Sequence, residues 1–213
     1  MVKKITTVLF DFDGVITNTE PLYDAFFDKL GEKYNLGHES FAAMVKGTTM
    51  KNVINKFLNH LPQSDINAIV RETEDFERQM DFPPVAGALE FIQYLKDNKY
   101  KVGMVTSSQD FKMKIALKSL GLTTTFDTEV TSDRITDGKP NPMCYLLAAD
   151  DLGANPAECI VFEDSYHGIE AGLAAGMKVI GLSTTIAEND LKKKVDHVIP
   201  DFSDKMLLIN ILG

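Results

Sequence analysis

Five short apolar segments recur along the chain, and they limit its possible folds more than any other feature. They are too short to be helices and mostly do not alternate between apolar and polar residues. That pattern is typical of strands buried on both faces of a parallel sheet. The segments are Ile5–Phe10, Val102–Val105, Ile160–Phe162, Val179–Leu182 and His197–Ile199.

Segments with helical periodicity lie between these predicted strands. Residues 86–100 place apolar side chains at spacings of three, and residues 109–122 repeat this pattern up to Gly121, which suits a helix end. Residues 166–176 form a shorter helical segment that is rich in small residues. The alternation of strand and helix predicts an α/β fold with a doubly wound parallel sheet.

One long segment interrupts this alternation. From Thr17 to Pro84 the sequence has helical periodicity and no convincing strand, and Pro83 and Pro84 close the segment. We interpret it as a helical insertion after the first strand. The predicted division is an α/β core of residues 1–16 plus 83–213 and a helical cap domain of residues 17–82.

Composition limits which binding partners and which cellular compartment we expect for the protein. The chain has 213 residues and a net charge of −9, so its surface repels nucleic acid and anionic membranes. No apolar segment reaches the ~20 residues of a membrane helix, and the first residues lack the apolar stretch of a signal peptide. Cys144 and Cys159 lie in apolar surroundings, which favours buried thiols over a disulfide. We therefore expect a cytoplasmic monomer that binds neither nucleic acid nor a membrane.

Two acids, Asp11 and Asp13, follow the first apolar segment. Side chains two apart on extended backbone point to the same side, and open α/β sheets bind ligands at the carboxyl ends of their strands. Two like charges so close favour a bound cation, of which Mg²⁺ is the simplest. Two other interpretations remain open: a hairpin turn at "DG", and a calcium loop with Glu20 at position twelve, which would put the non-ligating Leu9 at position one.

Later strand ends carry polar groups of the same kind. Thr106, Ser107 and Ser108 follow the second predicted strand, where hydroxyls and free backbone N–H groups form an anion cradle, unless a serine merely caps the next helix. Lys139 lies in a turn stiffened by two prolines, where the alternative is a solvated lysine.

A second acid pair, Glu163 and Asp164, ends another predicted strand. It suggests metal ligation, and the alternative is that Asp164 or Ser165 caps the following helix. Carboxylates, hydroxyls and one lysine at neighbouring strand ends together favour phosphoryl transfer with Mg²⁺.

The order of the stretches "DFDGVI", "VTSS", "GKPNP" and "FEDSYHGIEAG" resembles the haloacid dehalogenase (HAD) superfamily phosphohydrolases, in particular their β-phosphoglucomutase-like group. The resemblance covers the whole chain and implies a Rossmann-like core with an inserted helical cap. It implies that Asp11 is the nucleophile, that Asp13 is the general acid and base, and that Thr106 and Lys139 bind the phosphoryl group. Ser107 and Ser108 would add to the phosphate site. Asp11, the Asp13 carbonyl, Glu163 and Asp164 would hold Mg²⁺.

The cap of this group sets specificity, and the resemblance places Glu20, Tyr23, Lys46 and Gly47 near the substrate. Mutases of the group carry a histidine and an arginine where this chain has Tyr23 and Met50, which favours simple hydrolysis. Lys46 and Lys51 leave a cationic cap loop open, against the alternative of a solvated helix face.

We therefore expect a Mg²⁺-dependent phosphatase that acts on a small phosphorylated metabolite, with a sugar phosphate as the first expectation. The reaction would pass through an aspartyl phosphate. The alternatives are a sugar phosphomutase of the β-phosphoglucomutase type and a catalytically idle metal-binding protein.

Overall fold

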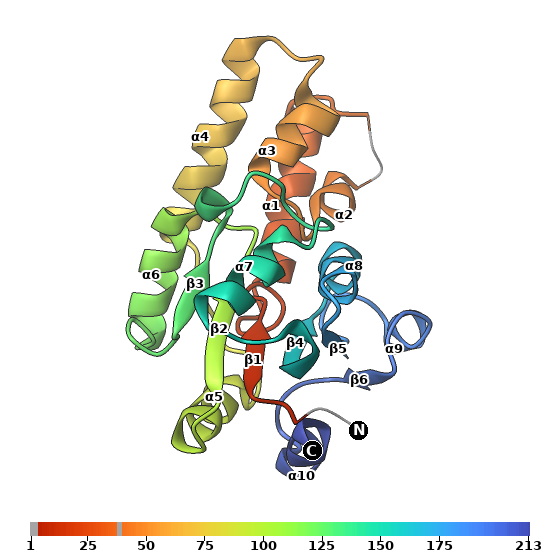
Figure 1. Ribbon diagram of the computed structural model, residues 1–213. Coiled ribbons are helices and arrows are strands. Elements are labelled where there is room, and N and C mark those ends of the chain that lie inside the picture. The colour runs from red at the N-terminus through yellow and green to blue at the C-terminus, as the bar shows by residue number, and fades with distance from the viewer. Residues whose placement is uncertain (1–3, 38–39) are drawn as a thin grey trace.

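A six-stranded, fully parallel sheet forms the centre of the computed structural model, which describes residues 4–37 and 40–213 (Figure 1). Residues 1–3 of the predicted core and 38–39 of the predicted cap lie outside the described residues. The strand order is β3-β2-β1-β4-β5-β6. The strands are β1 Thr7–Phe10, β2 Lys101–Val105, β3 Thr128–Val130, β4 Cys159–Glu163, β5 Lys178–Leu182 and β6 His197–Ile199.

The chain reverses its direction of travel across the sheet beside β1. It first moves outward through β2 to β3, and then crosses back to place β4 on the other side of β1. Such a switch point leaves a crevice at the carboxyl ends of the two central strands, where open α/β sheets bind their ligands.

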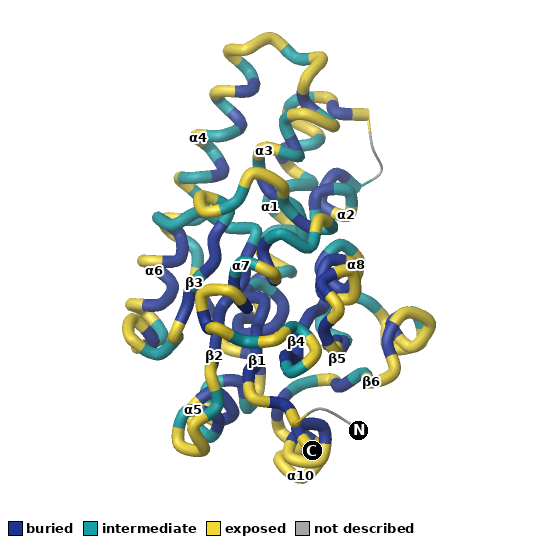
Figure 2. The backbone as a smooth tube through the Cα atoms, viewed as in Figure 1, coloured by how far each residue is buried: buried dark blue, intermediate teal, exposed yellow. Residues whose placement is uncertain are grey.

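Apolar side chains on alternate faces hold the sheet between two helical layers. Along β1, Val8 and Phe10 join one hydrophobic cluster while Leu9 joins the other. Phe10 stacks on Phe162 of β4 with ring centroids 5.2 Å apart. The two central strands, β1 and β4, are therefore buried on both faces, and Figure 2 shows them in the dark colour of buried residues.

Helices α5, α6 and α10 cover the first face, and α7, α8 and α9 cover the second. Gly121 ends α6 in the left-handed conformation that its sequence position predicted. These helices are α5 Ala88–Asp97, α6 Asp110–Leu120, α7 Met143–Asp151, α8 Tyr166–Ala174, α9 Glu188–Leu191 and α10 Lys205–Leu212.

The doubly wound α/β prediction is confirmed, and all five predicted strands are present. Strand β3 was missed because it has only three residues, Thr128–Val130, and lies at the edge of the sheet. Cys144 and Cys159 are free and buried, as predicted. No helix in the described part of the chain is long and apolar enough to cross a membrane.

The segment between β1 and α5 is helical and has its own hydrophobic cluster, which includes Leu30, Phe41, Leu58 and Ile69. It lies above the sheet in Figure 1, and its two ends meet where Thr17 bridges to Pro84. We call it the helical insertion; its domain boundaries at residues 17 and 82 stay a prediction. Its helices are α1 Glu20–Lys33, α2 Phe41–Val45, α3 Met50–Val53 with a π-helical continuation Ile54–Leu58, and α4 Gln63–Gln79.

Candidate active site

Four of the residues predicted to do the chemistry lie together at one edge of the sheet. Asp11 follows β1, Thr106 follows β2, and Glu163 and Asp164 lie at the end of β4. All four are buried. Carboxylate oxygens of the three acids lie within 4.8 Å of one another.

Lys139 reaches the same place from the loop before α7. Its ammonium donates hydrogen bonds to Asp11 Oδ1 at 2.6 Å, to Glu163 Oε1 at 2.6 Å and to the Val105 carbonyl at 3.2 Å. Burial by itself would lower the pKa of Lys139, but the two carboxylates more than offset this and raise it. The side chain is only 2% exposed, so the alternative of a solvated turn lysine is wrong.

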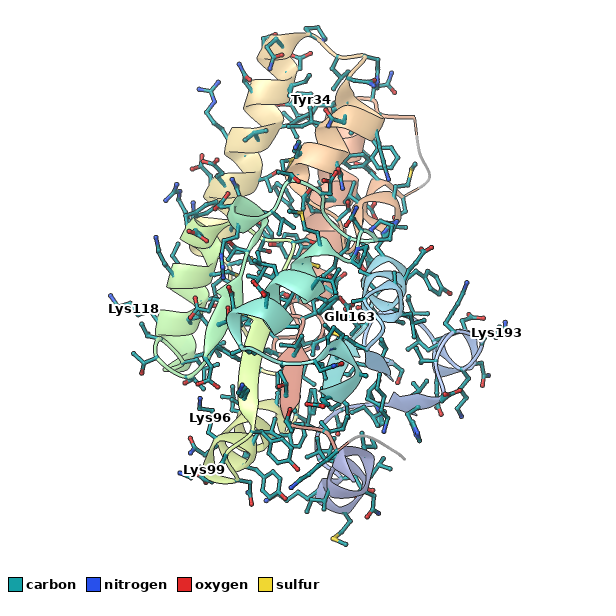
Figure 3. The ribbon with its side chains drawn as sticks, viewed as in Figure 1. Tyr34, Lys96, Lys99, Lys118, Glu163 and Lys193 are labelled. Carbon is teal, nitrogen blue, oxygen red and sulfur yellow. The ribbon has the colours of Figure 1, made fainter. Side chains whose placement is uncertain are left out.

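Glu163 holds Lys139 in place and uses both of its oxygens in hydrogen bonds. Oε1 also accepts from the Tyr145 hydroxyl at 2.8 Å, while Oε2 accepts from the Ser165 hydroxyl at 3.0 Å. Figure 3 shows Glu163 in the interior of the molecule. A Cβ on Gly168 would lie 1.7 Å from Glu163 Oε1, so only glycine fits at this position of α8.

The local charge fits a divalent cation. Three buried carboxylates face a single lysine, which leaves an excess of negative charge. Burial raises the pKa of Asp11 to about 7 against the pull of Lys139, and burial with the charges of Glu163 and Asp11 raises that of Asp164 well above its usual range. The described hydrogen bonds use Oδ1 of Asp11 and Oδ2 of Asp164, the latter with Thr185. One oxygen of each carboxylate therefore remains for a hard cation such as Mg²⁺.

Asp13 is not part of this cluster of acids, and three donors hold its side chain. Its carboxylate accepts from Thr19 Oγ1 at 2.6 Å, from Ser108 Oγ at 3.0 Å and from Lys112 Nζ at 2.5 Å. Asp13 is less buried than Asp11 and lines the cavity described below. This arrangement gives a fixed carboxyl group that reaches the substrate space.

The sequence analysis missed Lys112. It lies on α6, has no exposed surface, and its ammonium is 5.6 Å from the Phe12 ring centroid and 4.9 Å from that of Tyr23. The available signal was its position four residues before the buried Ala116, on the inner face of the helix. A lysine at such a position is usually assumed to reach solvent.

The three predicted phosphate-binding hydroxyls have different partners. Thr106 Oγ1 accepts from the Ser108 backbone N–H at 3.1 Å, while the Ser107 hydroxyl donates to the Gly47 carbonyl at 3.2 Å. Neither serine caps α6, since the N-cap is Gln109 without a side-chain bond, so that alternative is wrong. A helix cap is also the alternative for the acid pair after β4, and there it is correct for Ser165. The Ser165 hydroxyl accepts from the Gly168 backbone N–H at the start of α8.

Both alternative interpretations of the first acid pair are wrong. Strand β1 pairs in parallel with β2 and β4, so no hairpin follows it. Leu9, which would be position one of a calcium loop, is a buried strand residue paired with β2 and β4, so no calcium loop begins there.

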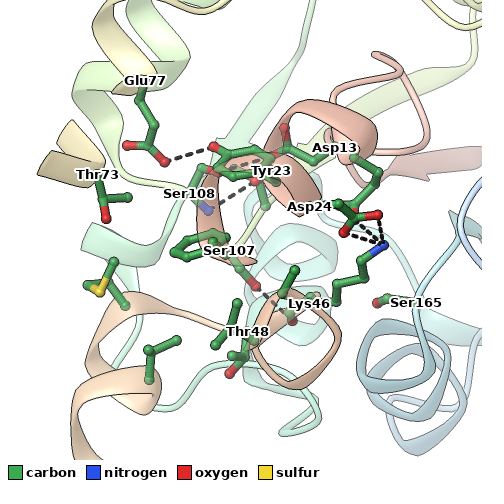
Figure 4. Close-up of a pocket in the computed structure, with 18 of the residues that line it drawn as sticks. Asp13, Tyr23, Asp24, Lys46, Thr48, Thr73, Glu77, Ser107, Ser108 and Ser165 are labelled. Carbon is green, nitrogen blue, oxygen red and sulfur yellow. Dashed lines mark hydrogen bonds and ion pairs between the residues drawn. The ribbon is translucent and has the colours of Figure 1, made fainter. Parts of the chain in front are cut away.

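The predicted substrate residues of the helical insertion line one cavity with Asp11. They are Glu20, Tyr23, Lys46 and Gly47. Figure 4 shows this cavity, with Tyr23 and Lys46 labelled among the residues that line it. The insertion also contacts the start of α8 directly: the His167 ring Nδ1 lies 3.2 Å from the Lys46 carbonyl, and a Cβ on Gly47 would collide with Ser165.

The Lys46 side chain is 24% exposed and is paired with two carboxylates, so its charge is not free. Its ammonium lies 3.2 Å from Glu20 Oε2 and 2.8 Å from Asp24 Oδ1. Lys51 donates to the Thr136 carbonyl at 3.1 Å and does not line the cavity. The open question of a cationic cap loop is thus answered for these two lysines, since carboxylates neutralise Lys46 and Lys51 points elsewhere.

Comparison with known proteins gives a consistent result. Residues 8–182 match the family model described as haloacid dehalogenase-like hydrolase. A phosphorylated carbohydrates phosphatase of Thermotoga maritima is 29% identical over 178 residues, which cover 81% of this chain and 82% of that protein. The pyrophosphatase PpaX of Bacillus pumilus is 28% identical over 209 residues, which cover 96% of each chain.

A solved structure has the same architecture. The crystal structure of β-phosphoglucomutase from Clostridium difficile superposes with a TM-score of 0.80, covering 98% of this chain and 96% of that one. At 23% sequence identity this likeness concerns the fold alone.

Proposed function

Because the chain belongs to the haloacid dehalogenase-like hydrolase family and is a phosphatase, we propose that it hydrolyses a phosphate monoester of a small sugar or polyol with Mg²⁺ as cofactor. The observation that carries this proposal is the convergence of residues far apart in the sequence. Asp11, Asp13, Thr106 and Asp164 line one cavity, and Lys139 is bonded to Asp11.

In the first step Asp11 attacks phosphorus with Oδ1, which lies beside the Lys139 ammonium, and forms an aspartyl phosphate, so that Oδ2 stays available to the cation. Lys139 lies 2.6 Å from Oδ1, which orients the nucleophile and offsets negative charge on the phosphoryl group. Thr106 lies at the adjoining strand end, where its hydroxyl and the neighbouring backbone bind the phosphoryl oxygens.

Asp13 acts as the general acid in the first step and as the general base in the second. Its carboxyl group donates a proton to the departing alcohol oxygen in the first step. As a carboxylate it then accepts a proton from the water that cleaves the aspartyl phosphate, which returns Asp11 and Asp13 to their starting states. Thr19, Ser108 and Lys112 keep Asp13 in one orientation for both steps.

Asp11, Asp164 and the Asp13 carbonyl are the residues that would hold Mg²⁺. Bound there, Mg²⁺ supplies positive charge that stabilises the transferring phosphoryl group. Glu163 already uses both oxygens to hold Lys139 and the turn after β4, so we assign it a positioning role beside the metal.

Two features count against the mutase alternative. The Tyr23 hydroxyl donates to Glu77 Oε1 at 2.8 Å, and burial raises the pKa of Tyr23 well above its usual range, so it is a poor proton shuttle near neutral pH. Met50 lines the cavity and offers no charge for a second phosphate. The intact set of catalytic groups counts against an idle protein.

The test is phosphate release from a panel of sugar phosphates and p-nitrophenyl phosphate, with and without Mg²⁺. We expect Mg²⁺-dependent release that an Asp11→Asn variant lacks. Folded protein that releases no phosphate from any compound refutes the hydrolase. Isomerisation of a hexose 1-phosphate with a bisphosphate primer, without net phosphate release, would support the mutase instead.

A further inference from the structure

The wall of the cavity opposite the strand ends is acidic. Four carboxylic acids of the helical insertion line it: Glu20 and Asp24 from α1, and Glu74 and Glu77 from α4. Figure 4 shows Asp24 and Glu77 on the two sides of Tyr23. The leaving group of a phosphate ester bound at Asp11 would occupy the space that these side chains border.

Positive charge on this wall is already neutralised. Lys46 is the one basic residue among the described residues that line the cavity, and it is paired with Glu20 and Asp24. Lys112 of α6 has no exposed surface and is paired with Asp13 at 2.5 Å. Within the part of the chain that the structure describes, the cavity therefore offers no cation free to bind a second anionic group.

The same wall suits hydroxyl groups. Carboxylate oxygens accept hydrogen bonds from alcohols, and the cavity adds the hydroxyls of Tyr23, Thr48 and Thr73. Phe27 and Val53 provide apolar surface between these polar groups, which matches the faces of a sugar or polyol. An anionic leaving group would instead meet an excess of like charge, because the four carboxylates are only partly compensated by Lys46 and Arg78, and like charge is an effective way to reject a competing ligand.

We propose that the site selects phosphate monoesters whose leaving alcohol is uncharged and polyhydroxylated, and that Asp24 and Glu77 exclude leaving groups that carry negative charge. Inorganic pyrophosphate, sugar bisphosphates and phosphorylated sugar acids are therefore poor substrates. This inference rests on the proposed phosphatase function. Of the two relatives compared above, it predicts that this chain resembles the phosphorylated carbohydrates phosphatase in its substrates more than it resembles the pyrophosphatase.

The test compares kcat/KM within matched pairs that differ in the charge of the leaving group. The pairs are fructose 1-phosphate with fructose 1,6-bisphosphate, glucose 6-phosphate with 6-phosphogluconate, and glycerol 1-phosphate with 3-phosphoglycerate, with pyrophosphate as a further anionic substrate. We expect the best neutral substrate to exceed its anionic partner and pyrophosphate by about 100-fold or more, since several like charges act together. Hydrolysis of pyrophosphate or a bisphosphate within about tenfold of the best neutral ester would overturn the inference.

Two variants locate the effect. Asp24→Asn removes one acid and releases part of Lys46, and Glu77→Gln removes another acid while it can still accept the Tyr23 hydrogen bond. Each is expected to raise the anionic-to-neutral ratio of kcat/KM about tenfold, with hydrolysis of the neutral ester showing that the protein is folded.

Glu72→Gln is the matched control. It makes the same change in net charge as either variant and lies on α4 with Glu77, but Glu72 pairs with Lys33 outside the cavity. An equal shift in this control would assign the effect to overall charge and refute the local wall. Failure of the phosphatase function is distinguishable, because p-nitrophenyl phosphate would then also release no phosphate.

Discussion

Replacing Lys112 by methionine tests how strongly catalysis depends on the orientation of Asp13. The Lys112 ammonium lies 2.5 Å from Asp13 Oδ2 and 2.9 Å from Ser108 Oγ, and the side chain has no exposed surface. Methionine has a similar volume and flexibility, so the substitution removes the charge and the hydrogen bonds and leaves little empty space. Asp13 keeps its bonds from Thr19 and Ser108.

The size of the effect follows from these contacts. A hydrogen bond to a charged group contributes about 1.5–3 kcal/mol, and breaking a fully buried pair costs about 3–5 kcal/mol. The Asp13 side chain is 15% exposed and keeps two donors, so we expect about 2–3 kcal/mol. At 1.36 kcal/mol per factor of ten, this corresponds to a loss of roughly 30- to 160-fold in kcat/KM for an alkyl phosphate.

The assay compares an alkyl phosphate with p-nitrophenyl phosphate. A nitrophenolate leaves without help from a general acid, so a misplaced Asp13 slows the alkyl ester more than the aryl ester. Thermal melting of the variant shows whether it is folded. Equal losses for both esters in a folded variant, or no loss for either, would refute the positioning role of Lys112.

Three further outcomes are expected. Gly168→Ala should destabilise the protein by roughly 1–3 kcal/mol in urea unfolding and lower activity, because the new Cβ collides with Glu163; unchanged stability would contradict the packing. Burial raises the pKa of the Cys144 and Cys159 thiols to about 11, so a disulfide reagent at about pH 8 should modify them only after unfolding, as absorbance would record. In the metal-free protein, burial also raises the pKa of Asp11 from its ordinary value of 3.8 to about 7. Between these two values the folded state binds more protons than the unfolded state, so the protein loses stability as pH rises through this interval. Mg²⁺ binds the deprotonated carboxylate, so the increase in Tm on adding Mg²⁺ should be larger at about pH 7.5 than at about pH 5. An increase at about pH 5 that equals or exceeds the one at about pH 7.5 would count against Asp11 as a ligand.

The strand-end residues could be predicted because a parallel sheet brings the carboxyl ends of its strands to one edge. Asp11, Thr106 and Asp164 each follow an apolar segment. Once those segments were recognised as neighbouring strands, the proximity of these three residues could be predicted. Strand β3 carries no such signal, because Thr128–Val130 is short and includes a glutamate.

Apart from the four insertion residues that the family resemblance placed near the substrate, contacts between the core and the helical insertion could not be predicted. Lys112 is buried because Asp13 and the Phe12 and Tyr23 rings surround it, and helical periodicity holds no information about those partners. Likewise, Asp24 and Glu77 belong to helices whose spacing is typical of any amphipathic helix. Their shared position beside the cavity follows from how α1 packs near α4 above the sheet.

The separate hydrophobic cluster of the helical insertion has an evolutionary consequence. The chain leaves the core after β1 and returns near Thr17 and Pro84, so the covalent link between the insertion and the core is narrow, and the insertion has a hydrophobic cluster of its own. Substitutions inside the insertion can therefore reshape the wall that faces the leaving group without disturbing the side chains packed against the sheet. A lineage with this architecture can acquire a new substrate by drift in one module while the phosphoryl-transfer chemistry stays under separate selection in the other.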